Sequence, residues 1–199
     1  LIQLIDMTDA SGFAALIAEP IQGVGGFATP PDGFFGAMHK VLDANGILFI
    51  SDEVQTGWGR TGDHFWGYQA HGIVPDILTF AKGVGNGITL AGCVARADVM
   101  NAIDRTSFTT FGGNPLSVAA GRATLKYVLD HDLQSNAAAR GLQMAQRLQK
   151  IIDDTEWIAE LRGKGLMLGI ECVHPGGIEP NPNAASALIE GCKSRGLLV

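Results

Sequence analysis

One stretch of this chain reads Ile47-Leu-Phe-Ile-Ser-Asp-Glu-Val-Gln55, in which a short apolar run ends in two acidic residues. The apolar run predicts a strand buried in a sheet, with Asp52 and Glu53 at its carboxyl end. Open α/β sheets place their ligand sites at this end of the strands. The carboxylates therefore either meet a ligand or cap the loop that follows, and this stretch alone favours neither role.

Two further apolar runs, residues 14–18 and 77–81, are bounded by turn residues and predict two more buried strands. A fourth strand is predicted over residues 90–95. Between the first two strands, Pro30-Pro-Asp-Gly33 opens a helix that ends near Asn45 and Gly46. A strand, a helix and a strand in this order predict a right-handed crossover and parallel pairing. The predicted fold class is therefore α/β, with a central, mostly parallel sheet flanked by helices.

The second half of the chain predicts helices over residues 114–129 and 133–152, then a strand over 165–170 and a helix over 184–195. We expect a boundary near residue 150, with 1–150 in a large domain and 151–199 in part of a small α+β domain. Residues 197–199 look like the start of another strand. Because the chain also begins inside an apolar segment, we expect it to be a fragment of a longer polypeptide.

The composition excludes several classes of protein. Hydrophobic residues make up 46% and charged residues 17% of the 199 residues, which is typical of a folded enzyme. The formal charge of -6 leaves no net attraction for nucleic acid or anionic lipid. No apolar run reaches the roughly 18 to 20 residues that cross a bilayer, and the chain starts without a signal-peptide pattern. For these two reasons we expect a cytoplasmic setting. The three cysteines and five histidines show no metal-ligand spacing, so we expect no metal site.

A single lysine follows the third predicted strand, in Thr79-Phe-Ala-Lys-Gly83. Such a lysine either extends its ammonium to solvent or, when desolvated, acts as an amine nucleophile toward an aldehyde. The crossover rule places Lys82 and Asp52 at the same edge of the sheet, which favours a shared pocket. This pocket suits pyridoxal 5′-phosphate (PLP), because the lysine can form a Schiff base while the aspartate keeps the pyridinium nitrogen protonated.

Four ordered motifs carry a resemblance to a known family. They are Glu19-Pro-Ile-Gln-Gly23, Ser51-Asp-Glu-Val-Gln-Thr-Gly-Trp-Gly-Arg-Thr-Gly62, Pro75-Asp-Ile-Leu-Thr-Phe-Ala-Lys-Gly83 and Thr110-Phe-Gly-Gly-Asn-Pro-Leu116. In their order and spacing, the chain resembles the class III PLP-dependent aminotransferases over nearly its whole length. The resemblance implies the PLP-dependent transferase fold of type I and a homodimer with shared active sites. It also implies transfer of an amino group from an amino acid or amine to a 2-oxo acid.

The resemblance implies a role for each matching residue. Lys82 is the lysine that bonds the cofactor and then moves the proton between substrate and cofactor, and Asp52 is the partner of the pyridinium nitrogen. Val54 contacts the ring face, and Gln55 hydrogen-bonds near the phenolic oxygen. Thr110 reaches the cofactor phosphate of the neighbouring subunit, so its role needs a dimer.

Three more positions stay open between a functional and a structural role. Glu19 matches a glutamate near the cofactor and substrate, but a purely structural role is as well supported. Arg60 could grip a substrate carboxylate, although the glycines around it favour an anchor for the loop. Arg162 resembles a structural element of the small domain.

The residue at position 24, a valine, indicates which class of substrate the enzyme uses. In relatives that act on 4-aminobutyrate or ornithine, a glutamate commonly stands at this position and pairs with a substrate-binding arginine. With valine there, and with His64-Phe-Trp-Gly67 further on, the chain looks more like the alanine:glyoxylate branch. The alternative is a 4-aminobutyrate or other omega-amino acid transaminase.

Relative to the family, the expected upstream half of the large domain, with its phosphate loop, and the downstream arginine for the substrate carboxylate are missing. An inactive fragment or a non-catalytic scaffold is therefore an alternative to an active enzyme. The strand that ends in Asp52 and Glu53 also resembles one of the nucleotide triphosphatases. That alternative is disfavoured, because no G-x-x-x-x-G-K-[ST] loop occurs.

Overall fold

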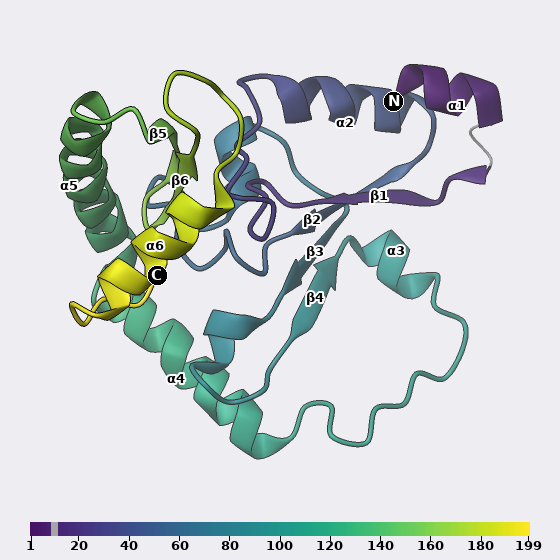
Figure 1. Ribbon diagram of the computed structural model, residues 1–199. Helices are drawn as coiled ribbons and strands as arrows, with labels where there is room; N and C mark the ends of the chain where they lie inside the picture. The colour runs from purple at the N-terminus through teal and green to yellow at the C-terminus, as the bar shows by residue number, and fades with distance from the viewer. Residues whose placement is uncertain (9–11) are drawn as a thin grey trace.

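The computed structural model describes residues 1–8 and 12–199 (Figure 1). Its central sheet has the strand order β1 (Ala15–Ala18), β2 (Leu48–Asp52), β3 (Ile77–Phe80) and β4 (Gly92–Ala95). The first three strands are parallel, and β4 pairs with β3 in the antiparallel direction. The predicted strands and the mostly parallel sheet are therefore confirmed, with β4 shorter at its start than expected.

The crossover between β1 and β2 is made by α2 (Phe34–Ala44), which begins directly after the predicted helix-opening signal. Gly33 at its start has φ 80°, a left-handed conformation that glycine adopts without steric strain. The ring of Phe35 on α2 packs against Phe49 of β2, with the ring centroids 5.8 Å apart. This contact forms the centre of the core on one side of the sheet.

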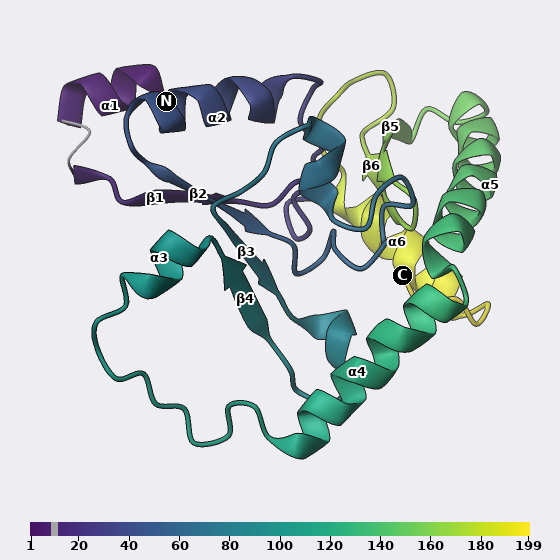
Figure 2. The ribbon, with the colours of Figure 1, turned by 180° about the vertical axis from the view of Figure 1, so that it is seen from behind.

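A short helix at the start of the chain, α1 (Ile2–Thr8), is absent from the sequence-based prediction. It lies beside α2 on the same side of the sheet (Figures 1 and 2), and its one buried residue, Ile5, joins the core around Phe35. The sequence carries no capping signal for this helix, since it has no acidic residue in its first turn and no basic residue in its last.

After β4, the chain forms the short α3 (Ala97–Asn101) and an exposed loop over residues 102–114. Two long helices follow, α4 (Pro115–Asp130) and α5 (Leu133–Asp153), which confirms both predicted helices. Asn114 caps α4, because its side chain accepts a hydrogen bond from the Ser117 backbone at 2.9 Å. α4 packs on the 3-10 turn η3 (Lys82–Gly85), so it supports the end of β3.

A second sheet consists of the antiparallel strands β5 (Ile158–Lys164) and β6 (Met167–Cys172). It packs on α5, and α6 (Pro182–Lys193) lies against β6. The strand predicted over 165–170 begins two residues later, because Gly165, with φ 56°, belongs to the hairpin turn. Residues 197–199, expected to start another strand, follow α6 as irregular chain here, and that expectation stays a prediction.

Closely approaching backbones connect this second sheet to the loop that follows β2. A Cβ atom on Gly141 of α5 would lie 2.2 Å from the Gly165 carbonyl oxygen. A Cβ on Gly165 would in turn lie 2.6 Å from the Arg60 carbonyl oxygen. That Arg60 oxygen also accepts the Leu166 backbone N–H at 3.1 Å. Only glycine fits at such distances, so the hairpin turn is held directly against residues 60 and 61.

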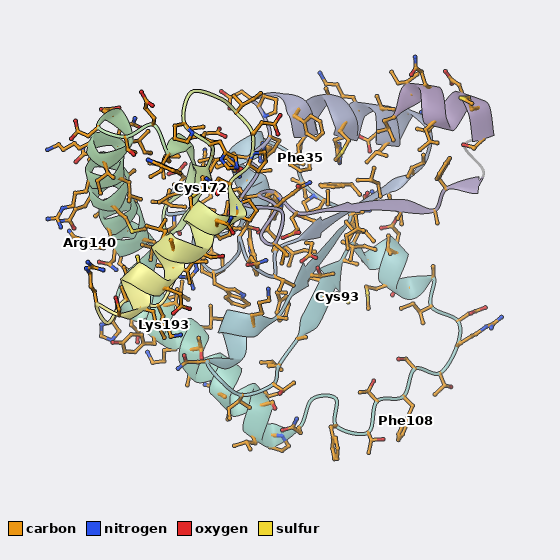
Figure 3. All side chains as sticks on the ribbon, viewed as in Figure 1. Phe35, Cys93, Phe108, Arg140, Cys172 and Lys193 are labelled. Atoms are coloured by element: carbon orange, nitrogen blue, oxygen red, sulfur yellow. The ribbon has the colours of Figure 1, made fainter. Side chains whose placement is uncertain are left out.

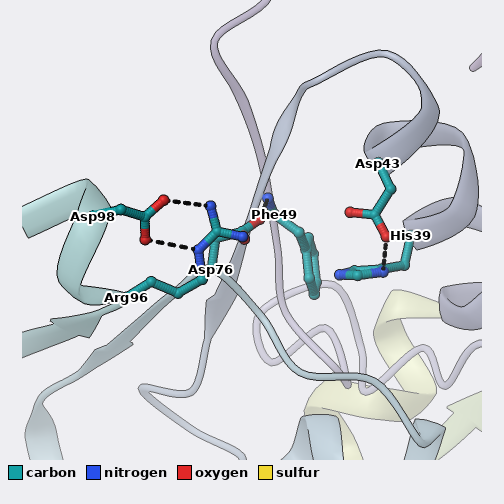
Figure 4. A network of polar contacts seen from close by, with 6 residues as sticks. All are labelled: His39, Asp43, Phe49, Asp76, Arg96 and Asp98. Atoms are coloured by element: carbon teal, nitrogen blue, oxygen red, sulfur yellow. Dashed lines mark hydrogen bonds and ion pairs between the residues drawn. The ribbon is translucent and has the colours of Figure 1, made fainter.

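Asp76 joins three segments at the amino end of β3 (Figure 4). Its Oδ2 accepts the Phe49 backbone N–H at 2.7 Å, and its Oδ1 pairs with Arg96 Nη1 at 2.6 Å. Arg96 also pairs with Asp98 at 3.0 Å. Because Asp76 is buried, these contacts fix β2, β3 and the segment after β4 relative to one another.

Within the two described ranges, no helix combines the length and the apolar character that a membrane crossing requires.

Candidate active site

The carboxyl ends of β1, β2 and β3 meet at one edge of the sheet. Ala18 pairs with Ser51, and Asp52 pairs with Thr79, so Glu19 and Asp52 follow neighbouring strands at the same level. Lys82 follows three residues after Thr79, at the start of η3. The expected placement of the lysine and the aspartate at one edge of a parallel sheet is therefore confirmed.

Lys82 borders a cavity of about 420 Å³, a volume within the usual range for small-molecule sites. Val54 and Gln55 line the same cavity, so three of the predicted cofactor residues share it. Lys82 has φ 47°, an unfavourable left-handed conformation for a residue with a side chain. Within residues 1–8 and 12–199, no ion pair engages its ammonium group.

Asp52 is half-buried at the tip of β2, two residues before Val54, and is not itself among the residues that line the cavity. Its Oδ1 accepts the Val54 backbone N–H at 3.1 Å and the Thr79 hydroxyl at 3.4 Å. These contacts fix the carboxylate beneath Val54. They engage one of its two oxygens, and within residues 1–8 and 12–199 no hydrogen bond engages the other, which can accept one.

Gln55 reaches the loop that follows β1. A Cβ on Gly23 would lie 1.7 Å from Gln55 Nε2, so the amide occupies the space that a side chain at residue 23 would need. The Gly23 backbone N–H donates to Glu19 Oε2 at 2.9 Å. Glu19 therefore holds the loop against which Gln55 rests, and it acts on the cavity through that loop in this arrangement.

Glu53 is fully buried, unlike its neighbour Asp52. Its carboxylate accepts the Thr56 hydroxyl at 2.6 Å and the backbone N–H groups of Gly67 and Tyr68, both at 2.8 Å. The Ser51 hydroxyl donates to it at 3.1 Å. Burial, and secondarily the negative charge of Glu53, raise the pKa of the Tyr68 phenol. Of the two acidic residues, Glu53 is thus the one that anchors the loop after β2.

Thr110 does not lie at the cavity of this chain. It belongs to the exposed loop over residues 102–114, which stands away from the sheet and carries Phe108 (Figure 3). Phe108 is 83% exposed and Phe111 is 81% exposed. The role of Thr110 toward a neighbouring subunit stays a prediction.

The two arginines differ in their surroundings. Arg60 is exposed and lines the cavity, while its carbonyl holds the hairpin turn through Leu166. The side chain of Arg162 is 19% exposed and pairs with both Glu160 and Glu171. These hydrogen bonds, that with Glu171 foremost, raise the pKa of Arg162. Arg162 therefore has the packed position expected of a structural element.

The sequence does not predict several of the residues that line the cavity. Phe27, Trp58 and Met167 line the cavity, together with Thr124 of α4 and Asn136 of α5. Trp58 lies within a quoted motif, next to glycines that signal a tightly packed loop. The others come from segments distant in the sequence, and no local pattern marks them.

The family follows from comparison with known proteins. The model of the family described as Aminotransferase class-III matches residues 2–199. This chain belongs to the class III aminotransferases. The cofactor that this membership implies is PLP.

Two named relatives match nearly the whole of this chain. The human mitochondrial alanine–glyoxylate aminotransferase 2 is 41% identical over 194 residues, which cover 96% of this chain and 38% of the relative. The 4-aminobutyrate aminotransferase of Mycobacterium leprae is 37% identical over 191 residues, which cover 96% of this chain and 43% of the relative. Both matches include the whole region of the Lys82 cavity, yet the chain spans less than half the length of either relative.

A solved structure shares the fold. The amine transaminase from an uncultivated Pseudomonas species, in its PLP-bound form, has a TM-score of 0.92 and 35% sequence identity. The match covers 100% of this chain and 47% of that one. The chain therefore has the α/β fold of a PLP-dependent transaminase over its length.

The residues at the cavity fit PLP. A lysine without an ion pair among the described residues, the apolar Val54 and the amide of Gln55 border one space. Asp52 is held by the Val54 backbone next to them, with one carboxylate oxygen that no described residue engages. These are the groups needed to hold an aldehyde, an aromatic face, a phenolic oxygen and a protonated ring nitrogen.

Proposed function

We propose that the protein containing this chain is an aminotransferase that moves an amino group from an amino acid or amine to a 2-oxo acid. The observation that supports this most strongly is the shared cavity of Lys82, Val54 and Gln55, with Asp52 fixed beneath Val54. Lys82 is exposed in this chain, so the support comes from the cavity that it shares with these residues and not from desolvation of its amine. The class III membership supports the same reaction.

Each residue has a distinct task in this proposal. The Lys82 amine holds the cofactor through its aldehyde carbon and, once released, carries a proton to or from the substrate Cα. Asp52 keeps a proton on the ring nitrogen through its free oxygen. Val54 packs on the ring face, and Gln55 donates to the phenolic oxygen. PLP supplies an electron sink that weakens the substrate Cα–H bond.

The amino donor that we propose is alanine or a related small amine, with glyoxylate or pyruvate as the acceptor. The apolar Val24 supports this choice, as does the similarity to the human relative named for alanine and glyoxylate. Val24 is 95% exposed in this chain and does not line the cavity, so it can act on the substrate only through another part of the protein. A 4-aminobutyrate or other omega-amino acid donor is the alternative, which the Mycobacterium leprae relative supports.

The assembly that we propose is a homodimer, in which Thr110 of one subunit binds the cofactor phosphate of the other. The exposed loop that carries Thr110, with its two exposed phenylalanines, supports a role at a subunit contact. We also propose that residues 1–150 belong to the PLP-binding domain and 151–199 to the small domain, since the second sheet begins at Ile158.

A cytoplasmic location is part of the proposal. It is supported by the acidic composition and by the free thiols of Cys93, Cys172 and Cys192. The human relative is named as mitochondrial, so cell fractionation with an antibody against this protein has two defined outcomes.

The reaction can be tested on the full-length protein that carries this sequence. The lysine-bound cofactor absorbs visible light, and we expect Lys82→Ala to abolish that band together with turnover. Lys82→Arg is the matched control for charge, and it should fail equally, because a guanidinium does not bond an aldehyde under these conditions. Retention of the band and of activity in Lys82→Ala would refute the assignment.

The donor can be tested with alanine, 4-aminobutyrate, β-alanine and ornithine, each with glyoxylate and with pyruvate. We expect the highest kcat/KM with alanine. A preference for 4-aminobutyrate or ornithine would overturn the inference from Val24 and leave the reaction class intact. Absence of turnover with every donor, in a protein that binds PLP, would favour the non-catalytic scaffold.

A further inference from the structure

We propose that Phe27 forms a size-selecting wall of the Lys82 cavity and that Arg162 acts as a positioning residue that holds this wall in place. The inference rests on the proposed aminotransferase reaction and concerns which side chains the site admits. Phe27 and Lys82 line the same cavity, although they follow different strands.

The backbone at Phe27 is strained. Gly26 has φ 77° and Phe27 has φ 56°, so two consecutive residues adopt the left-handed region. A residue with a side chain in that region costs roughly 1–2 kcal/mol and persists only where its surroundings fix it. The ends of this turn are joined by the hydrogen bond from the Gln22 backbone N–H to the Ala28 carbonyl at 3.1 Å. The turn therefore presents the Phe27 ring in one orientation.

Arg162 supports the turn from the second sheet. Its Nε donates to the Gly26 carbonyl at 2.5 Å, across 136 positions of sequence. The remaining nitrogens are committed to carboxylates, because Nη1 pairs with Glu160 at 2.9 Å and Nη2 pairs with Glu171. A guanidinium is planar and rigid, so these two ion pairs fix the direction in which Nε points. Arg162 is thus preorganised to hold the residue before Phe27.

The other side of the turn rests on β6. A Cβ on Gly169 would lie 3.0 Å from Phe27 Cδ2 and 3.1 Å from the Gly26 carbonyl oxygen. The backbone of β6 therefore lies close to the Phe27 ring, and a side chain at residue 169 would contact that ring. Met167, at the start of the same strand, is buried and lines the cavity beside it.

This arrangement limits the size of the donor side chain that the cavity admits. A side chain on the amino donor that extends from the Lys82 amine toward Phe27 meets this ring, and we expect the nearby β6 backbone to limit how far the ring moves. The wall contains no charged group, so it discriminates by size and not by charge. We expect donors with short apolar side chains to be accepted and each added methylene to lower kcat/KM.

The test uses the full-length holoenzyme and a series of donors with growing side chains: alanine, 2-aminobutyrate, norvaline and norleucine. We expect kcat/KM to fall along the series in the wild-type enzyme. Phe27→Ala should raise kcat/KM for norleucine relative to alanine by roughly 10-fold or more, the size of effect that one or two methylenes produce in a tight pocket. Phe27→Leu, which keeps an apolar side chain, should give a smaller shift in the same direction. Phe34→Ala, on an exposed phenylalanine of α2 outside the cavity, is the matched control and should leave the ratio unchanged.

Arg162 is tested by its coupling to Phe27. Arg162→Lys keeps the positive charge beside Glu160 and Glu171 but lacks the Nε–H that binds Gly26, and it should raise the norleucine-to-alanine ratio severalfold. In the Phe27→Ala background, the same change should leave the ratio as it is, because the wall is already gone. A merely structural arginine would lower the melting temperature equally in both backgrounds and would not move the ratio.

The possible results distinguish a failure of the roles proposed for Phe27 and Arg162 from a failure of the proposed reaction. If active Phe27→Ala and Phe27→Leu enzymes keep the wild-type ratio of kcat/KM for norleucine to that for alanine, Phe27 does not select substrates by size. If Arg162→Lys leaves this ratio unchanged, Arg162 does not position Phe27. The proposed role of Phe27 is also refuted if the wild-type enzyme turns over none of the four donors in this series but does turn over other donors. Retention of the cofactor band after Lys82→Ala would instead refute the reaction itself.

Discussion

Gly23 leaves the space that the side chain of Gln55 occupies, since a Cβ on residue 23 would lie 1.7 Å from Gln55 Nε2. The loop after β1 and the loop after β2 are thereby matched to each other at the cavity. The Gln55 amide is the flexible end of a side chain, so added bulk at residue 23 moves the amide and not the backbone.

Gly23→Ala should therefore weaken cofactor binding with little loss of stability. Loss of one hydrogen bond of about 1 kcal/mol corresponds to a roughly 5-fold increase in the Kd for PLP. Titration of the apo full-length protein with PLP measures this change, and thermal melting of the apo protein measures stability. The matched control is Gly36→Ala on α2, where a Cβ meets nothing within 4 Å. That variant should bind PLP normally, and unchanged affinity in Gly23→Ala would contradict the proposed role of Gln55.

Glu53→Gln should destabilise the fold by about 2–3 kcal/mol, because hydrogen bonds to a charged group are worth about 1.5–3 kcal/mol each and the amide reverses one of them. The reason is the full burial of the carboxylate among donors from Thr56, Gly67 and Tyr68. Urea unfolding of the full-length protein measures the loss. Glu156→Gln, at an exposed position, serves as the control and should have little effect. Equal stabilities of the two variants would show that Glu53 is no anchor.

Asp76→Ala should lower the free energy of unfolding by about 2–3 kcal/mol, because it leaves the Phe49 backbone N–H buried without its acceptor. Arg96→Ala should also lower the free energy of unfolding, because it leaves the buried Asp76 carboxylate without its cation. In the Asp76→Ala background, the further change Arg96→Ala should have almost no effect on the urea midpoint. Additive losses in this double-mutant cycle would mean that the ion pair in Figure 4 does not couple the two residues.

Stability should fall on mild acidification because of His71. Burial foremost, and then the positive charge of Lys164, lower the pKa of His71, while Asp32 acts in the opposite direction. The unfolded chain then takes up this proton at a higher pH than the folded chain does. The stability that His71 contributes is present above its unfolded pKa of about 6.5 and is lost as the pH falls through the lower folded value.

Urea midpoints measured from about pH 7 down to about pH 5 check this dependence. We expect His71→Gln to flatten the slope over that range. His131→Gln, at an exposed position, should leave the slope as in the wild type. A wild-type slope in His71→Gln would assign the acid sensitivity to another group.

The sheet could be predicted from the sequence because its strands are short apolar runs bounded by turn residues. The same reasoning located Asp52 and Lys82 at one edge, since the carboxyl ends of parallel strands coincide. It chose Asp52 as the partner of the cofactor, but it did not predict that Glu53 is buried as the anchor of the following loop. Only the position of residues 67 and 68 shows which carboxylate is enclosed.

The rest of the cavity depends on contacts between distant segments. Phe27 and Met167 carry no local sign of their position, and the Arg162 contact that holds the Phe27 turn spans 136 residues. α1 was missed for a different reason, because a short helix without an acidic residue in its first turn or a basic residue in its last resembles any apolar segment. Thr110 illustrates a third limit, since its predicted role needs a second chain.

The contribution of Leu166 and Met167 to the cavity has a consequence for biosynthesis. A nascent polypeptide emerges from the ribosome in order, so the segments bearing Lys82, Gln55 and Phe27 are available well before this hairpin turn is translated. We therefore expect the cavity to be complete only after residues 166 and 167 have been translated.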